Sequence, residues 1–226
     1  MKICVIKSNF DNGSRDQFTD ETDNSENKEE DQMKHYDKQI LEARREEERR
    51  KHTTLETGIY VDDELIIFER ITLPGTRVQI LLPEYFMPMQ ETVRNVKYPS
   101  RNAPDFIVTS LDSTVNFGFN VLPVRLDEGG TGVMSSQFQE ALRNVNPSIR
   151  ISERVDDAAT DKGSEMSWFG FKGYALDGQI YNRMYIIRLA KTALHGIFNC
   201  SPRVRDQWED IADQCFRSVE ETWGGI

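Results

Sequence analysis

Two adjoining β-rich runs, Asp105–Ser110 and Thr114–Leu122, constrain the fold of this chain more than any other feature of its sequence. The short polar connection between them, Leu111–Asp112–Ser113, predicts a β-hairpin. In the second run, Val115, Phe117, Phe119 and Val121 share one side of the strand, and Asn116, Gly118 and Asn120 share the other. One face therefore meets a core, and this requirement fixes the register of the neighbouring strands.

The charge balance narrows the kinds of partner that the chain can bind. Its 226 residues carry a formal net charge of −10, and the sequence pI is about 4.9. Binding to nucleic acid needs clustered Lys and Arg, and adsorption to anionic lipid needs positive charge, so we expect no nucleic-acid partner and no lipid binding. No run approaches the roughly 18 apolar residues of a membrane helix, so we expect no membrane insertion.

The amino terminus and the cysteines indicate a reducing compartment. The apolar run Ile3–Ile6 is shorter than the core of about 7–15 residues that a secretory signal needs. Cys4, Cys200 and Cys215 are odd in number and widely spaced, which predicts reduced thiols, two of them buried, rather than a disulfide framework. We therefore predict a cytoplasmic location.

Composition divides the chain into an extension and a folded domain. Residues 11–31 combine high charge with few large apolar residues, which predicts disorder. Residues 32–51 favour a helix with ion pairs along it, and their narrow apolar stripe favours a solvated helix over a partner-binding one. The predicted division is an acidic, largely disordered extension over residues 1–57, with the charged helix at 32–51, and a folded domain over residues 58–226.

Strands dominate the predicted domain. The strongest hairpin signal is Asp177–Gly178, between two long β-rich segments. Besides the first hairpin, we expect strands over Glu64–Leu73, Val78–Leu82, Ile149–Val155, Met166–Leu176, Gln179–Leu189 and Ala193–Cys200. The predicted fold class is α+β, with an antiparallel β-sheet and flanking helices.

Three segments of the domain have helical patterns. The first is Met87–Val96, with Pro88 in its first turn. The second is Ser135–Val145, and the third begins with Ser201 as its cap and Pro202 at its first position. The residues expected on the buried faces of the last two helices are Phe138, Ala141, Leu142 and Val145 and then Val204, Trp208, Ile211, Ala212, Cys215 and Val219.

The two long strands around Asp177–Gly178 are apolar on both faces, so both faces need a cover. If both good helices cover one face, or if one covers each, part of the sheet is left bare. A bare apolar sheet face is a typical partner groove. Core packing is the favoured interpretation for most of the aromatic residues here, and partner binding is the alternative. The candidate partner-binding residues are Trp168, Phe169, Phe171, Tyr174, Tyr181 and Tyr185.

The residue types that carry catalysis do not assemble into a recognisable site. Two of the three histidines lie in the charged extension, and the third, His195, is expected to face away from Cys200 on one strand. The acidic run Asp156–Glu165 lacks the spacing of a calcium loop. The glycines of Asp127–Gly132 lack the Lys-Ser/Thr of a phosphate-binding loop and are read as a flexible connection. We therefore predict no catalytic residue, no metal and no cofactor.

Three features together resemble the Mog/PsbP-like superfamily. They are the run Val96–Leu122, the Asp-Gly hairpin, and the Ser-Pro-led carboxy-terminal helix with Trp208, so the resemblance covers about Glu64–Thr222. It implies an α/β/α sandwich around an antiparallel sheet, and non-enzymatic work. In that superfamily, Ran-binding members bind a small GTPase, PsbP members bind a photosystem assembly, and related bacterial domains act as adaptor chaperones for secreted effectors. No binding residue of the family can be carried to a position of this chain.

The function predicted from these observations is that of a non-catalytic protein-interaction module. Its expected form is an adaptor or chaperone that binds an apolar segment of a partner protein on its sheet face. The alternative is an enzyme whose active-site residues are too dispersed along the chain to be recognised.

Overall fold

A computed structural model of the protein describes residues 23–98, 103–175 and 178–222. The chain divides into two units, Met1–Glu48 and Arg49–Ile226. Helix α1 (Asp23–Lys51) begins before residue 32, so residues 23–31, which were predicted to be disordered, are helical. An acidic sequence suits the positive end of a helix dipole, which accounts for the earlier start. The remainder of the disorder prediction, residues 11–22, lies outside the described residues.

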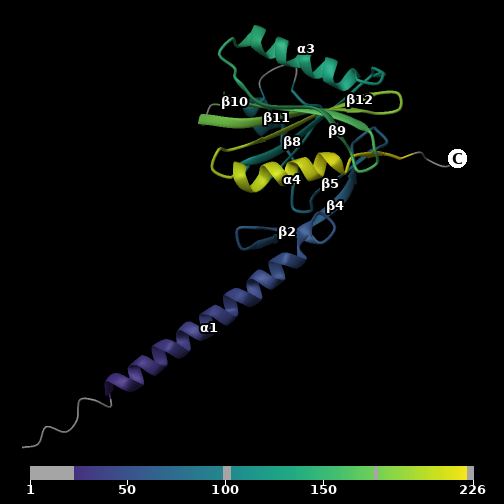
Figure 1. Ribbon diagram of the computed structural model, residues 1–226. Helices are drawn as coiled ribbons and strands as arrows, with labels where there is room; N and C mark the ends of the chain where they lie inside the picture. The colour runs from purple at the N-terminus through teal and green to yellow at the C-terminus, as the bar shows by residue number, and fades with distance from the viewer. Residues whose placement is uncertain (1–22, 99–102, 176–177, 223–226) are drawn as a thin grey trace, which may run out of the picture. The chain divides into compact units, whose positions relative to one another are not determined.

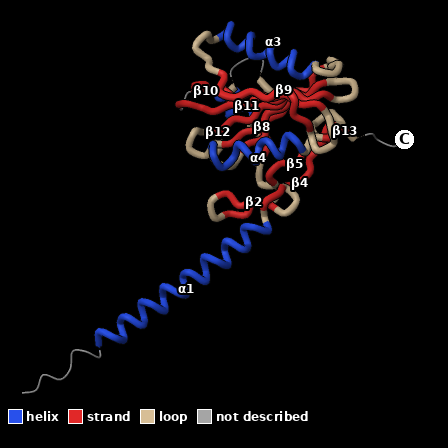
Figure 2. Tube along the Cα trace, viewed as in Figure 1, coloured by secondary structure: helices blue, strands red, loops and turns tan. Residues whose placement is uncertain are grey.

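The second unit is built on a seven-stranded antiparallel sheet with strand order β6-β7-β8-β12-β11-β10-β9 (Figure 1). Figure 2 shows these strands in red between the helices. The strands are β6 (Met87–Pro88), β7 (Phe106–Thr109), β8 (Val115–Leu122), β9 (Ile151–Ala159), β10 (Glu165–Ala175), β11 (Gly178–Arg188) and β12 (Ala193–Cys200). The predicted hairpins β7–β8 and β10–β11 are both present. The α+β fold class with an antiparallel sheet is confirmed.

Two small three-stranded sheets adjoin the main one. Their strands are β1 (Thr53–Thr54), β2 (Gly58–Val61) and β3 (Glu64–Ile66), and β4 (Phe68–Thr72), β5 (Val78–Pro83) and β13 (Glu220–Glu221). The single strand predicted over Glu64–Leu73 is therefore wrong, because it is broken at Ile67. The residues before the break pair with β2, and those after it pair with β5.

One helix covers each face of the main sheet: α3 (Gly130–Val145) lies on one side and α4 (Arg205–Arg217) on the other (Figure 1). This is the α/β/α arrangement that the resemblance implied. Phe216 of α4 stacks on Tyr185 of β11 with their ring centroids 3.9 Å apart. It fits there because β12 carries Gly196 opposite Tyr185, and a Cβ at Gly196 would lie 2.1 Å from the Phe216 ring.

The first predicted helix begins later than expected. Met87 and Pro88 form the edge strand β6, and helix α2 starts only at Glu91 and ends at Lys97. An edge strand tolerates proline because its outer side needs no backbone donor. The prediction that Pro88 lies in the first turn of this helix is therefore wrong.

Helix α3 begins earlier than expected, at Gly130, inside the predicted flexible connection. Its first turn is closed by the Glu165 carboxylate, which accepts hydrogen bonds from the backbone N–H groups of Gly129 (3.0 Å) and Thr131 (3.1 Å). Against the opposing effect of burial, a hydrogen bond from the Thr131 hydroxyl and these two backbone bonds hold the pKa of Glu165 below its usual range. The predicted cap at Ser135 or Ser136 is therefore wrong. The carboxylate that closes the first turn comes from a distant strand, which leaves no signal in the sequence near the helix.

The buried face of α3 is also more polar than predicted. Thr131, Ser135 and Gln139 are buried, whereas Val145, expected in the core, is 87 % exposed. Thr131, Ser135 and Gln139 recur at four-residue steps and so share one face of the helix, whereas Val145 is its last residue. Phe138 still faces the sheet and stacks on His195 with a centroid distance of 4.4 Å.

Helix α4 has the predicted buried face but a later start. Its amino-terminal flanking residue is Val204, so Ser201 and Pro202 precede the helix and do not cap it. The buried residues of the helix include Trp208, Ile211, Ala212 and Cys215, as the spacing predicted. Strand β9 likewise runs to Ala159, so part of the predicted acidic loop is strand.

Candidate functional site

Helix α3 packs mainly over β9, β10 and β11, and at the other end of the same sheet face Tyr98, which follows α2, lies over Asn199. A cleft of about 370 Å³ lies at this end, and none of its described lining residues comes from α3. We call it the sheet-end cleft. Its lining residues are Lys97, Tyr98, Asp112, Ser113, Thr114, Asn116, Phe171, Gly173, Tyr174, Gln179, Ile180, Asn182, Asn199 and Ser201. They come from four strands of the main sheet and from the chain around them, so strand pairing fixes their positions.

A row of asparagines crosses the sheet at this cleft. Asn116 on β8 is paired with Asn199 on β12, which is paired with Asn182 on β11. The next position along the row is Phe171 of β10. Because directly paired residues share a face, all four side chains belong to the same side of the sheet. The row therefore presents three amides and one aromatic ring along a single line.

Hydrogen bonds fix two of the three amides. The hydroxyl of Thr109 donates to Oδ1 of Asn116 at 2.7 Å, and Nδ2 of Asn116 donates to Oδ1 of Asn199 at 2.8 Å. Nδ2 of Asn199 then donates to the hydroxyl of Tyr98 at 2.6 Å. Burial raises the pKa of Tyr98, so its hydroxyl stays protonated at neutral pH. The bonded amides are held in one orientation, as a preformed recognition surface requires.

The cleft also has apolar and aromatic walls. Phe171 is buried beside it, whereas the Tyr174 side chain is 83 % exposed. Gly173 lies between these two residues in β10, and a Cβ there would come within 3.2 Å of Nδ2 of Asn182. The glycine therefore keeps the space beside the Asn182 amide open. A few fixed polar groups against an apolar wall form the usual composition of a binding pocket.

The structure brings together only two of the six predicted partner-binding residues at this cleft, Phe171 and Tyr174. Phe169 lies on the same sheet face as Phe171 and is fully buried. The other three lie on the face that α4 covers; Tyr181 and Tyr185 are buried, and Trp168 is half-buried. An exposed aromatic surface made by all six residues does not exist, because α3 and α4 each cover a face. Whether any of the six contacts a partner stays a prediction.

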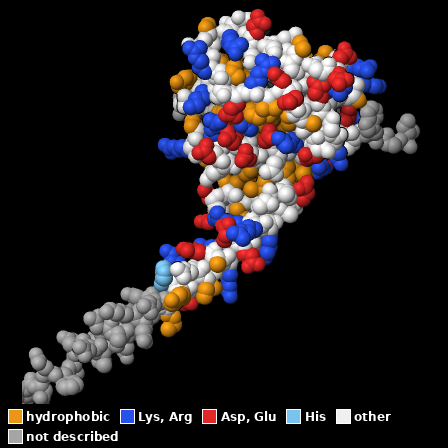
Figure 3. Space-filling model, viewed as in Figure 1, with side chains coloured by type: hydrophobic (Ala, Val, Ile, Leu, Met, Phe, Trp, Pro, Cys, Tyr) orange, Lys and Arg blue, Asp and Glu red, His pale blue; other side chains and the backbone are white. Residues whose placement is uncertain are grey.

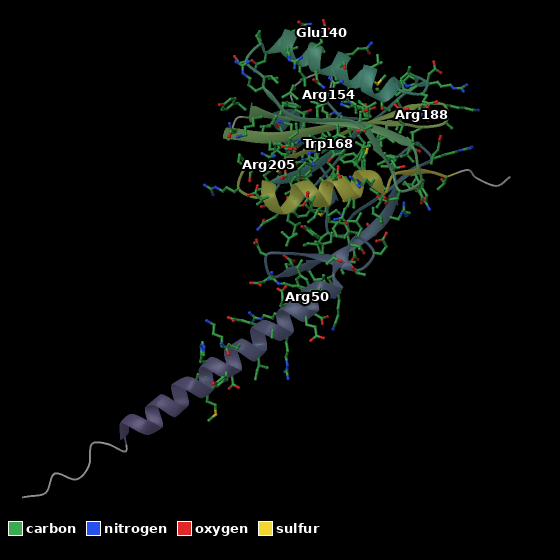
Figure 4. All side chains as sticks on the ribbon, viewed as in Figure 1. Arg50, Glu140, Arg154, Trp168, Arg188 and Arg205 are labelled. Atoms are coloured by element: carbon green, nitrogen blue, oxygen red, sulfur yellow. The ribbon has the colours of Figure 1, made fainter. Side chains whose placement is uncertain are left out.

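The aromatic residues on the α4 side surround a buried arginine instead. Arg183 is buried, its guanidinium lies 4.1 Å from the centroid of the Trp168 ring, and its Nη2 lies 2.9 Å from a Glu153 oxygen. Arg205 and Glu209 complete a network of two arginines and two glutamates. Figure 4 shows Trp168 and Arg205 on the α4 side of the sheet. In this network two positive charges balance two negative charges. The aromatic residues that pack around it therefore have a structural role.

The described residues do not assemble an obvious reactive pair. His195 is buried, and burial lowers its pKa to about 4, so it is neutral at pH 7. Cys200 lies in the core on the opposite face of β12, and burial raises the pKa of its thiol to about 12. Among the residues that the structure describes, no three or more His, Cys, Asp or Glu side chains are grouped as a metal site would need.

Within the described ranges, every helix is too short or too polar to span a bilayer.

Comparison with known proteins supports the fold. No family model matches the sequence, and no curated protein matches it either. The cyanobacterial PsbP protein CyanoP from Synechocystis sp. PCC 6803 has a similar solution structure, with a TM-score of 0.52 and 10% sequence identity, over 73% of this chain and 98% of that chain. This similarity agrees with the antiparallel sheet and the two helices that cover it. The chain therefore has a Mog/PsbP-like fold, as the sequence resemblance predicted.

Two further solved structures are similar at a lower level. The Ran-binding protein Mog1p from Saccharomyces cerevisiae has a TM-score of 0.45 and 11% identity, over 69% of this chain and 96% of that chain. LpqN, involved in cell envelope biogenesis of Mycobacterium tuberculosis, has a TM-score of 0.44 and 13% identity, over 74% of this chain and 96% of that chain.

Proposed function

We propose that this chain is a non-catalytic interaction module that binds an extended segment of a partner protein in the sheet-end cleft. The observation that carries the proposal is the half-buried Asn182 amide, which is paired with Phe171 on one side and with the bonded Asn199 on the other, in a cleft with no described lining residue from α3. Asn116 and Asn199 are buried and bonded to each other, so the half-buried Asn182 amide is the one of the three that can donate to and accept from the backbone of an extended peptide. The aromatic and aliphatic walls accommodate its apolar side chains.

The adaptor or chaperone form of this module, acting in the cytoplasm, is the version that the sequence predicts. An open cleft of fixed polar groups suits it, because the backbone of many partner segments offers the same donors and acceptors. The buried, neutral His195 and the buried Cys200 thiol supply no support for the alternative prediction of an enzyme.

A selection of random displayed peptides on the full-length protein tests the proposal. We expect the selected peptides to share an apolar residue, and to bind Tyr174→Ala about tenfold more weakly, as anchors of small interfaces do. Val133→Ala is the matched control, because Val133 is also exposed but lies on α3. Peptides that bind both variants as tightly as the unchanged chain would place the interface elsewhere.

A further inference from the structure

A second, larger groove lies on the other side of the turn between β7 and β8. It has a volume of about 730 Å³ and lies between the β2–β3 hairpin, that turn and the start of α4. We call it the β2–β3 groove. It shares Asp112 and Thr114 with the sheet-end cleft but is otherwise lined by different residues. Figure 3 shows hydrophobic side chains at the surface between α4 and the β2–β3 hairpin.

The groove has an apolar lining with one exposed side chain. Leu111, at the turn, is 73 % exposed. Tyr85, Val61 and Val204 are half-buried, and Trp208 is buried beneath them. An exposed leucine next to partly buried apolar residues is a surface that gains free energy when another apolar side chain covers it.

The rim of the same groove is acidic. Asp62, Asp63, Glu64 and Asp112 line it and are all exposed, and its described lining residues include no Lys, Arg or His. Hydrogen bonds from Ser110 and Thr114 hold the pKa of Asp112 below its usual range, against burial, so this carboxylate is ionised at neutral pH. The pKa of Tyr85 is raised to about 12, mainly by burial and further by the negative charges of Glu64 and Asp112.

One arginine of the protein already binds to this acidic rim. The guanidinium of Arg49 lies 2.7 Å from Oδ1 of Asp63 and also donates to the backbone oxygen of Asp62 at 2.8 Å. Asp62 is held in place from the other side by Gln207, whose Nε2 donates to its carboxylate. Among the described residues, Asp62 and Asp112 accept hydrogen bonds from neutral side chains, and neither they nor Glu64 form an ion pair.

We propose that the β2–β3 groove binds a segment of another protein in which an arginine adjoins a large apolar residue. The carboxylates of Asp62, Glu64 and Asp112 receive the guanidinium, and Leu111 with Tyr85 receives the apolar side chain. Arginine fits better than lysine because its weakly hydrated, planar group pairs with carboxylates and stacks on aromatic rings. Apart from Asp112 and Thr114 this surface is separate from the sheet-end cleft, and the groove variant changes Asp62 and Glu64, which line only the groove, so either proposal can fail alone.

Fluorescence anisotropy with a labelled peptide of alternating Leu and Arg tests this. The groove variant Asp62→Asn/Glu64→Gln removes two charges at exposed positions, and Asn suits the positive φ of 54° at Asp62. Glu140→Gln/Asp157→Asn is the matched control, because it removes the same charge from exposed residues of α3 and β9. We expect roughly tenfold weaker binding for the groove variant and unchanged binding for the control.

Two further probes test the chemistry of the groove. A peptide with Gln in place of Arg, and the variant Leu111→Ser with the original peptide, should each bind more weakly. Equal weakening by the groove and control variants would show diffuse attraction to an acidic protein and would overturn the proposal. Unchanged binding by the groove variant would overturn it as well, and so would a Lys peptide that binds more tightly than the Arg peptide.

Discussion

Nδ2 of Asn116 donates a hydrogen bond of 2.8 Å to Oδ1 of Asn199, at directly paired positions on β8 and β12. Both amides are buried inside the sheet, where water cannot replace a lost partner. The bond therefore does two things. It satisfies two polar groups that would otherwise destabilise the fold, and it fixes the amide row that lines the sheet-end cleft.

Removing one amide of this pair should destabilise the protein. Asn116→Ala leaves Oδ1 of Asn199 without its donor and removes the shortest hydrogen bond of the Thr109 hydroxyl, so we expect a loss of about 1–3 kcal/mol in the free energy of unfolding. Urea denaturation followed by tryptophan fluorescence measures it. Asn144→Ala, at an exposed position of α3, is the control and should cost nothing.

The same pair should be energetically coupled. In a double-mutant cycle with Asn199→Ala, the two losses should be less than additive, because the first substitution already breaks the shared bond. Strictly additive losses would show that the two amides act separately.

His195 should make stability depend on pH. Its pKa is about 4 in the folded chain, because burial disfavours the charged ring, and about 6.5 in an unfolded chain. The unfolded chain therefore takes up the proton first as the pH falls, and about 3 kcal/mol of stability is lost between pH 6.5 and 4. Urea denaturation across this range should show a shallower decline for His195→Gln than for the unchanged chain. Identical slopes would rule out the buried histidine as the cause.

Among the charged residues on the α4 side of the sheet, Arg183 should cause the largest loss of stability when it is replaced. Arg183→Met leaves Glu153 and Glu209 to share Arg205 alone and removes the donor to the Tyr181 hydroxyl, and we expect a loss of roughly 3 kcal/mol. Arg154→Gln breaks an exposed pair with Asp156 and should cost less than about 1 kcal/mol. Thermal unfolding compares the two, and the account of the buried network fails if both variants lose the same amount.

Gly196 should tolerate no side chain. A Cβ there would lie 2.1 Å from the buried Phe216 ring, so Gly196→Ala must displace α4 and should cost about 1–3 kcal/mol. Gly132→Ala, within α3, meets nothing closer than 3.6 Å and should stabilise the chain by about 0.5–1 kcal/mol. Denaturant midpoints of the two variants should therefore move in opposite directions. A neutral Gly196→Ala would mean that α4 packs less closely than described.

Sequence patterns captured the sheet better than the helix ends. Alternation placed Phe117 and Phe119 in the core, and the turn signals located both long hairpins. The start of α3 was missed because its cap is the Glu165 carboxylate from another strand, which no local motif reveals. Pro88 was assigned to a helix because nothing local distinguishes an edge strand from a first helical turn.

The candidate site was only partly predictable. Tyr174 and Phe171 were chosen for their aromatic rings, and they do line the cleft. Asn116 was read only as a residue on the other side of a strand, and Asn182 and Asn199 were not singled out, although Asn is uncommon inside strands and could have served as a signal. That Asn116, Asn182 and Asn199 meet depends on the pairing of β8, β12 and β11, which spacing along the chain does not encode.

The central claim is that the sheet-end cleft binds a peptide. The most direct measurement is a two-dimensional NMR titration of the full-length protein with a peptide selected on it, following the side-chain amides. We predict that the signals of Asn116, Asn182 and Asn199 shift together and saturate with one affinity. Shifts confined to residues outside the cleft, with these three amides unmoved, would contradict the account.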